Sequence, residues 1–106
     1  MGRLGRIKQA ALITRDGVLI NEIPEKTCTG ISTAMLAASL AAAETAFAEI
    51  RKGKPDMMVL CMNGERIIVK GAGPEMLLTA MIDDKVDDNI VLPIIEETAE
   101  IIKSMS

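Results

Sequence analysis

The sequence contains no histidine, tryptophan or tyrosine, and its single aromatic residue is Phe47. Without histidine, the chain lacks the side chain that most often serves as a general base near neutral pH, and a cysteine–histidine catalytic pair is impossible. With one aromatic ring, base stacking and aromatic cages for cations are excluded. Much of catalytic chemistry is therefore unavailable, and we predict no catalytic residue, no cofactor-binding residue and no metal ligand.

Acidic residues outnumber basic residues by 15 to 12, and cysteines are scarce. The net charge of −3 and the pI near 4.9 leave no basic patch for phosphates, so nucleic acid is not an expected partner. Cys28 and Cys61 are too few for a disulfide framework and indicate reduced thiols in a cytoplasmic protein. The longest uncharged run, 27–43, is rich in alanine, threonine and serine, and membrane insertion is not expected. The length fits one domain over 1–106.

Five segments rich in leucine, isoleucine, valine and methionine have the length and the flanking turn residues of β-strands. They span residues 9–14, 18–23, 56–63, 65–72 and 75–82. Asp16-Gly17 joins the first two and Asn63-Gly64 joins the third and fourth, and both dipeptides are typical of tight hairpins. We therefore expect antiparallel strand pairs.

Two segments are predicted to be helical, over 31–52 and 89–105. The first is expected to start from an N-cap at Thr27 or Thr29 and to end before Gly53. The second carries its apolar residues on one face and its glutamates on the other. The resulting order, ββαβββα, predicts an α+β fold with helices on both faces of the sheet.

The long helix has two apolar stripes. The first stripe follows a spacing of four and three residues, which is suited to packing on a sheet. It comprises Leu36, Leu40, Ala43, Phe47 and Ile50. The second stripe is made mostly of small residues, so either a helix from a second copy approaches it closely or alanine is simply tolerated at the surface. It comprises Ile31, Met35, Ala38, Ala42 and Ala46.

The strand 56–63 is apolar on both faces, since Val59 and Cys61 point one way and Leu60 points the other. We therefore expect it to be sandwiched, with Cys61 in the core. If the strand lies at a sheet edge, its unpaired amides favour pairing with another copy, because the strand carries no lysine or proline. The residues predicted to form a dimer interface are Met35, Ala38, Ala42, Met57, Met58, Val59, Leu60, Cys61 and Met62.

Other candidate sites have ordinary explanations. The glycine-rich segment 70–75 precedes a strand and is interpreted as a turn. The acidic segment 83–89 lacks the glycine and glutamate spacing of a calcium loop, and we expect a solvated loop with a helix N-cap at Asp88 or Asn89. Glu44 and Glu49 are expected on the solvent side of the long helix. Nothing singles out Arg15, Arg51 or Arg66.

The segment "AALITRDGVLI" (10–20), followed by "MLAASLAAAETAFAEIRKG" (35–53), resembles the Roadblock / dynein light chain domain, and the similarity extends in order over about residues 7–105. The resemblance implies a profilin-like, five-stranded antiparallel sheet. It also implies a dimer in which the third strands pair and the long helices lie side by side. Members of the family regulate or scaffold Ras-like small GTPases, or serve as adaptor subunits, and have no substrate pocket.

One departure from the family concerns the start of the chain. A helix usually precedes the first strand, whereas here about eight residues precede Gln9, with Gly2 and Gly5 among them. We expect that helix to be missing, which would expose apolar residues of the first strands as an interaction site. The alternative is that the shortened arm or a shifted last helix covers them.

The function expected from these features is a non-enzymatic homodimer, or a higher oligomer, that binds a Ras-like small GTPase and either stimulates hydrolysis or holds the GTPase in place. A pure adaptor without effect on turnover is the second hypothesis. A small enzyme or sensor using the thiol of Cys28 is the third. The sequence does not indicate which residues would contact a GTPase.

Overall fold

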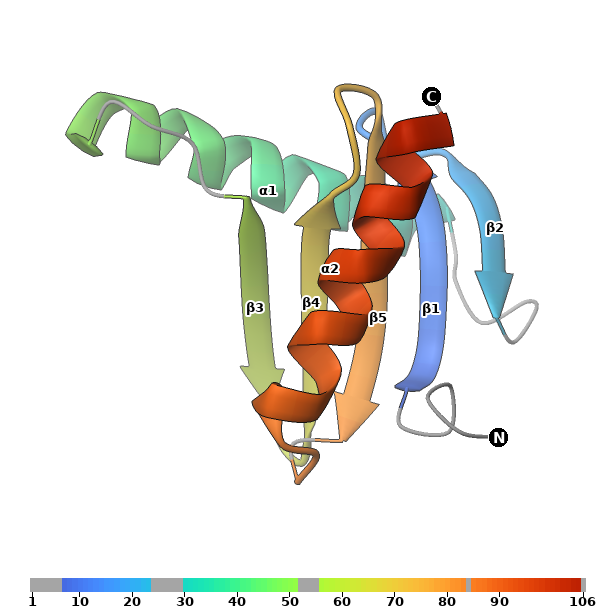
Figure 1. Ribbon diagram of the computed structural model, residues 1–106. Helices are drawn as coiled ribbons and strands as arrows, with labels where there is room; N and C mark the ends of the chain where they lie inside the picture. The colour runs from blue at the N-terminus through green and yellow to red at the C-terminus, as the bar shows by residue number, and fades with distance from the viewer. Residues whose placement is uncertain (1–6, 24–29, 52–55, 84, 106) are drawn as a thin grey trace.

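The computed structural model describes residues 7–23, 30–51, 56–83 and 85–105 (Figure 1). The predicted order ββαβββα is confirmed, with boundaries within two residues of those expected. The elements are β1 (Ile7–Thr14), β2 (Leu19–Ile23), α1 (Gly30–Arg51), β3 (Met57–Met62), β4 (Glu65–Gly71), β5 (Met76–Asp83) and α2 (Asp88–Met105). The region that would hold a preceding helix, together with Cys28 and the candidate caps Thr27 and Thr29, lies outside the described residues.

The five strands form one antiparallel sheet in the order β2-β1-β5-β4-β3. Two hairpins, β1–β2 and β3–β4, pair locally, while β5 joins them by pairing with both β1 and β4. The contact between β1 and β5 brings Ile13 opposite Leu77, which is distant in the sequence. Consequently β2 and β3 are the two edges of the sheet.

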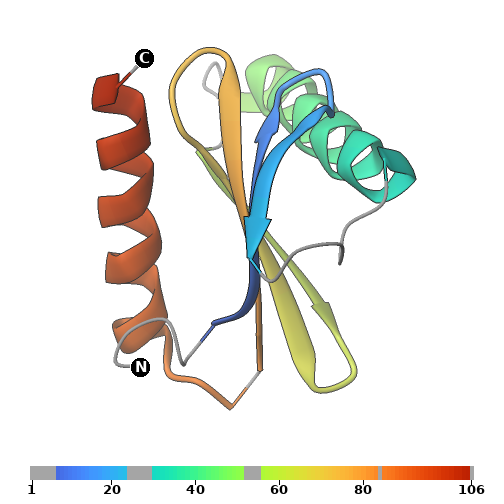
Figure 2. The same cartoon turned by 90° about the vertical axis from the view of Figure 1, so that its right-hand side faces the viewer.

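The sheet separates two apolar layers, each covered by one helix (Figure 2). On one face, Ala37 and Leu40 of α1 are buried with residues of β1, β4 and β5. On the other face, Ile95 and its neighbours one helical turn away in α2 pack against β4 and β5. Successive residues of β5, such as Leu77 and Leu78, point to opposite faces and so contribute to different layers.

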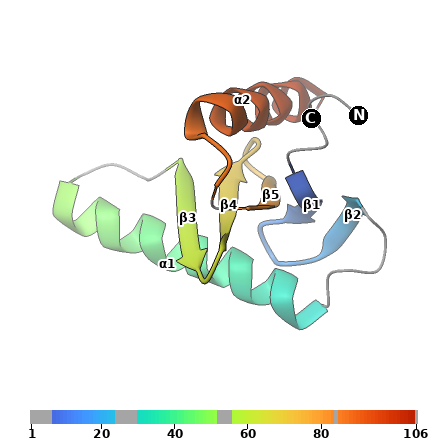
Figure 3. The same cartoon turned by 90° about the horizontal axis from the view of Figure 1, so that it is seen from below.

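Helix α1 is longer than the sheet is wide. Its 22 residues span about 33 Å, and it continues beyond β3 in two perpendicular views (Figures 1 and 3). Every residue of the segment 45–50 is exposed, including Phe47 (49%) and Ile50 (74%). The predicted core stripe is thus correct for Leu40 but wrong for Phe47 and Ile50, because the described strands end before this part of the helix.

The acidic loop leads into α2, as expected, although the cap is displaced by one residue. The side chain of Asp87 accepts a hydrogen bond from the backbone N–H of Asn89 at 2.8 Å, which makes Asp87 the N-cap rather than Asp88 or Asn89. Neither of the two described helices is both long and apolar enough to cross a membrane.

Candidate protein-binding surface

Exposed apolar side chains lie on the edge strand β3 and on the overhanging end of α1. We call this the β3–α1 surface and define it by five exposed residues. They are Phe47 and Ile50 from α1, and Val59, Leu60 and Cys61 from β3. Met58 belongs to the core layer beneath α1 and Met57 to the layer beneath α2. Leu60 therefore points to the α1 side of the sheet, and Val59 and Cys61 point to the α2 side, so this surface wraps around the sheet edge. Exposed large apolar side chains on an isolated chain typically mark a site of association.

The backbone of β3 adds to this surface. On its inner side the strand pairs with β4, placing Leu60 opposite Ile67 and Val59 opposite Ile68. Its outer side has no neighbour in the described sheet and carries no lysine or proline to deter pairing. The prediction that this strand is sandwiched, with Cys61 in the core, is wrong for a single chain, because an edge strand leaves Cys61 exposed.

The remaining predicted interface residues fall into two groups. Met35, Ala38 and Ala42 are exposed on α1, and the two alanines lie on the side of the helix opposite Leu40. Met57 and Met58 are half-buried against the two opposite core layers, so they also support the fold of their own chain. The side chain of Met62 lies outside the described residues. The assignment of all nine residues to an interface stays a prediction.

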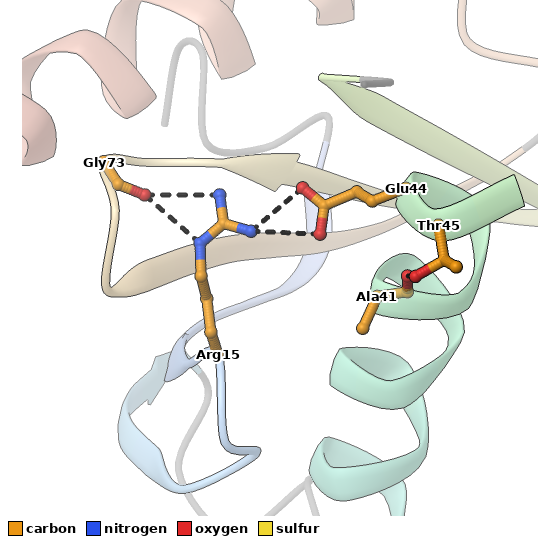
Figure 4. A network of polar contacts seen from close by, with 5 residues as sticks. All are labelled: Arg15, Ala41, Glu44, Thr45 and Gly73. Atoms are coloured by element: carbon orange, nitrogen blue, oxygen red, sulfur yellow. Dashed lines mark hydrogen bonds and ion pairs between the residues drawn. The ribbon is translucent and has the colours of Figure 1, made fainter. Parts of the chain in front are cut away.

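A polar network holds α1 to two turns of the sheet (Figure 4). Nη1 of Arg15 donates to both carboxylate oxygens of Glu44, at 3.1 and 3.4 Å, and Nε and Nη2 of Arg15 both donate to the carbonyl oxygen of Gly73 at 3.3 Å. The side chains of Arg15 and Glu44 are 33% and 20% exposed. The expectation that Glu44 faces solvent is therefore wrong, because the arginine reaches it from the β1–β2 turn.

The same turn touches α1 at a second point. Gly17 has φ +91°, and a Cβ atom built on it would lie 2.5 Å from the Cα atom of Ala34. Arg15 and Gly17 thus contact positions ten residues apart on α1, or about 15 Å along its axis. The dipeptide Asp16-Gly17 predicted the hairpin, but no local sequence pattern predicted that this turn contacts the helix.

Arg66 is likewise engaged within the chain. Its Nη1 forms an ion pair with Asp88, and its Nη2 donates to the carbonyl oxygen of Val86 at 2.6 Å. The side chain is 13% exposed. Arg15 and Arg66 are therefore both engaged in contacts within the chain. The side chain of Arg51 lies outside the described residues.

The described residues carry exposed apolar side chains. Among them, no group of three or more histidine, cysteine, aspartate or glutamate side chains is placed to hold a metal ion. Two apolar features among the described residues are the β3–α1 surface and a groove of about 290 Å³ beside α2.

Comparison with known proteins gives a match to the Roadblock/LC7 domain over residues 1–81. A Roadblock/LC7 domain from Streptomyces avermitilis has a TM-score of 0.88 at 14% identity, over 98% of this chain and 91% of that chain. Myxococcus xanthus MglB has a TM-score of 0.87 at 14% identity, over 97% and 87%. A profilin from Schizosaccharomyces pombe has a TM-score of 0.73 at 17% identity, over 96% and 89%. No curated protein sequence matches the chain. The predicted profilin-like fold is confirmed.

Proposed function

Because this chain belongs to the Roadblock/LC7 domain family, we propose that it is a cytoplasmic, non-catalytic homodimer that regulates a Ras-like small GTPase. The observation that carries the homodimer is the β3–α1 surface. The family resemblance supplies the GTPase as the class of partner.

A two-fold axis beside β3 accounts for both parts of this surface. Antiparallel pairing of β3 with its copy would satisfy the outer backbone groups of both strands and join the two sheets into one. The same rotation would carry the overhanging end of α1 toward the partner's β3, where Phe47 and Ile50 could pack on apolar side chains such as Leu60. The overhang of α1 is then a feature of the dimer rather than an unsupported end.

The internal contacts of the arginines constrain how such a dimer could act. An arginine inserted into a GTPase site accelerates hydrolysis by about 10³–10⁵-fold. Arg15 would first have to leave Glu44 and Gly73, and Arg66 would have to leave Asp88 and Val86. We therefore favour an effect exerted by reshaping the GTPase over one exerted by either of these two arginines.

The same contacts favour a second candidate function, that of an adaptor that holds a GTPase without changing its turnover. The two functions differ in one observable, the rate of GTP hydrolysis by the bound GTPase. Both require the dimer, and both leave the chain itself without catalytic chemistry.

The test is retention of small GTPases on the immobilised full chain, in the presence of GDP or a non-hydrolysable GTP analogue. The matched control is Leu60→Arg, which we expect to be monomeric. Retention of a GTPase by the wild type with one nucleotide, but not by the control, would support the proposal, and hydrolysis by the purified pair would then separate regulator from adaptor. Equal retention by both proteins, or none with either nucleotide, would contradict it.

A further inference from the structure

A polar pocket of about 330 Å³ is lined by the β4–β5 turn and by the second half of α2. Three cationic side chains from three separate elements line it: Arg15 of the β1–β2 turn, Lys70 of β4 and Lys103 of α2. Two carboxylates, those of Asp56 and Glu100, complete the charged part of the lining. Among the described residues, the pocket shares no lining residue with the β3–α1 surface or with the apolar groove beside α2. It is therefore a separate feature, polar rather than apolar.

Lys70 supplies a positive charge inside this pocket. It lies two residues after Ile68, which is buried in the core layer beneath α2, so both side chains point to the α2 side of the sheet. The side chain of Lys70 is 14% exposed. Because enclosing an unpaired ammonium group is costly, Lys70 requires an anion beside it. The identity of that anion decides what the pocket can bind.

Asp56 provides this anion from the solvent side. It forms an ion pair with Lys70, and its own side chain is 73% exposed. Asp56 directly precedes β3 rather than lying in the strand, so its carboxylate can turn into water without exposing a core residue. Because an exposed carboxylate readily regains its hydration, another anion can replace it at little cost. The lysine is thus fixed by the sheet, whereas its anionic partner is exchangeable.

Gly71 provides the space in which two of these charged groups approach each other. A Cβ atom added to it would lie 3.0 Å from Nη2 of Arg15 and 3.6 Å from Oδ1 of Asp56. The guanidinium is held in place, because Glu44 and the carbonyl oxygen of Gly73 accept its hydrogen bonds. An anion that takes the place of the Asp56 carboxylate therefore comes near a second, firmly held cation.

We propose that this pocket binds a carboxylate side chain from an acidic segment of a partner protein, in place of Asp56. A carboxylate has the size and charge for this position, since Asp56 already presents one to Lys70. The volume of about 330 Å³ is at the lower end of the range for ligand pockets, about 300–1,000 Å³, and suits one side chain with its neighbouring peptide. Asp56 then acts as an internal competitor that the partner displaces.

The charges that remain after this exchange favour one bound carboxylate. Once Asp56 has turned away, three cations and one carboxylate, that of Glu100, are left in the lining. Glu44 offsets one of the cations through its ion pair with Arg15, so one positive charge is left for the partner. Charge complementarity of this kind determines mainly which partner is chosen and how fast it associates. The inference does not depend on the proposed GTPase.

The test is fluorescence anisotropy of a short labelled peptide with a central run of glutamates, titrated with the full chain at low ionic strength. The matched probe carries glutamines in place of the glutamates. We expect saturable binding of the glutamate peptide alone. Asp56→Asn removes the internal competitor and should tighten this binding about tenfold, while Lys70→Gln removes the central cation and should weaken it about tenfold or more.

Lys8 and Glu65 supply the matched controls, because they form an ion pair that does not line this pocket. Lys8→Gln and Glu65→Gln change the net charge as the two test variants do and should leave the affinity unchanged. Equal affinity of Asp56→Asn and Glu65→Gln would overturn the proposal, as would equal affinity of Lys70→Gln and Lys8→Gln. The first comparison is decisive even if Lys70→Gln does not fold.

Two other results would overturn the proposal by assigning the pocket to a different occupant. The first is competition by inorganic phosphate that is as effective as competition by the unlabelled glutamate peptide, which would indicate a site for small anions. The second is a wild-type assembly larger than a dimer that Lys70→Gln reduces to a dimer, which would indicate an acidic segment of a second copy. Each result is independent of GTPase retention and of the effect of Leu60→Arg.

Discussion

Because the β1–β2 turn contacts α1, we expect substitution by alanine to reduce the free energy of unfolding by different amounts at two glycines with similar backbone angles. Gly17 has φ +91° and Gly64 has φ +78°, so an L side chain is strained at either position. At Gly64 a Cβ atom would meet nothing within 4 Å, and Gly64→Ala should cost the strain alone, about 1–2 kcal/mol. This variant is the matched control.

At Gly17 the added Cβ atom would lie 2.5 Å from the Cα atom of Ala34, closer than real Cβ contacts. Because the contacted atom is backbone, the turn or the whole helix must move, which loosens Ala37 and Leu40 in the core beneath α1. We expect Gly17→Ala to lower the free energy of unfolding by about 2 kcal/mol more than the control does, a difference of about 10 °C in melting temperature.

The assay is urea unfolding followed by far-UV circular dichroism, with all proteins at one concentration, since any dimer stabilises the fold in proportion to concentration. Equal losses for the two variants would refute the claim that the turn and α1 are in contact. A larger loss for Gly64→Ala would refute it as well.

Arg15→Gln should lower the free energy of unfolding by about 1–3 kcal/mol, because the largely buried carboxylate of Glu44 loses its ion-pair partner. The control is Lys8→Gln, which removes an exposed ion pair with Glu65 and should lower it by less than about 1 kcal/mol. Urea unfolding measures both changes. Phe47→Ala should leave the stability of a monomeric Leu60→Arg background nearly unchanged, yet weaken wild-type self-association about tenfold or more, as measured by dilution in sedimentation equilibrium. Cys61, which is exposed in the single chain, should be alkylated more slowly in the wild type than in Leu60→Arg, and equal rates would place it outside the interface.

Local sequence patterns were sufficient to predict the helices and strands, and to predict that helices cover both faces of the sheet. The dipeptides Asp16-Gly17 and Asn63-Gly64 located both hairpins because tight turns need residues that tolerate positive φ. For the strand 56–63, apolar on both faces, pairing with another copy was expected only if the strand lay at a sheet edge, and the structure places it at an edge.

Local patterns could not predict the width of the sheet or the contacts between segments that are distant in the sequence. Helical periodicity shows which side of α1 faces the sheet, but not where the sheet ends, so Phe47 and Ile50 were assigned to the core of their own chain. The partnership of Arg15 with Glu44 depends on how α1 crosses a turn 29 residues earlier in the chain. Spacing within the helix gave no sign of that crossing.

We propose above all that the β3–α1 surface joins two copies of the chain. Sedimentation velocity of the wild type and of Leu60→Arg tests it most directly, with Ala42→Glu as a second variant on the helix. We expect a wild-type mass of twice the 11.3 kDa chain, and a mass of one chain for Leu60→Arg. A wild type that sediments as a single chain, or a Leu60→Arg variant that remains dimeric, would contradict it.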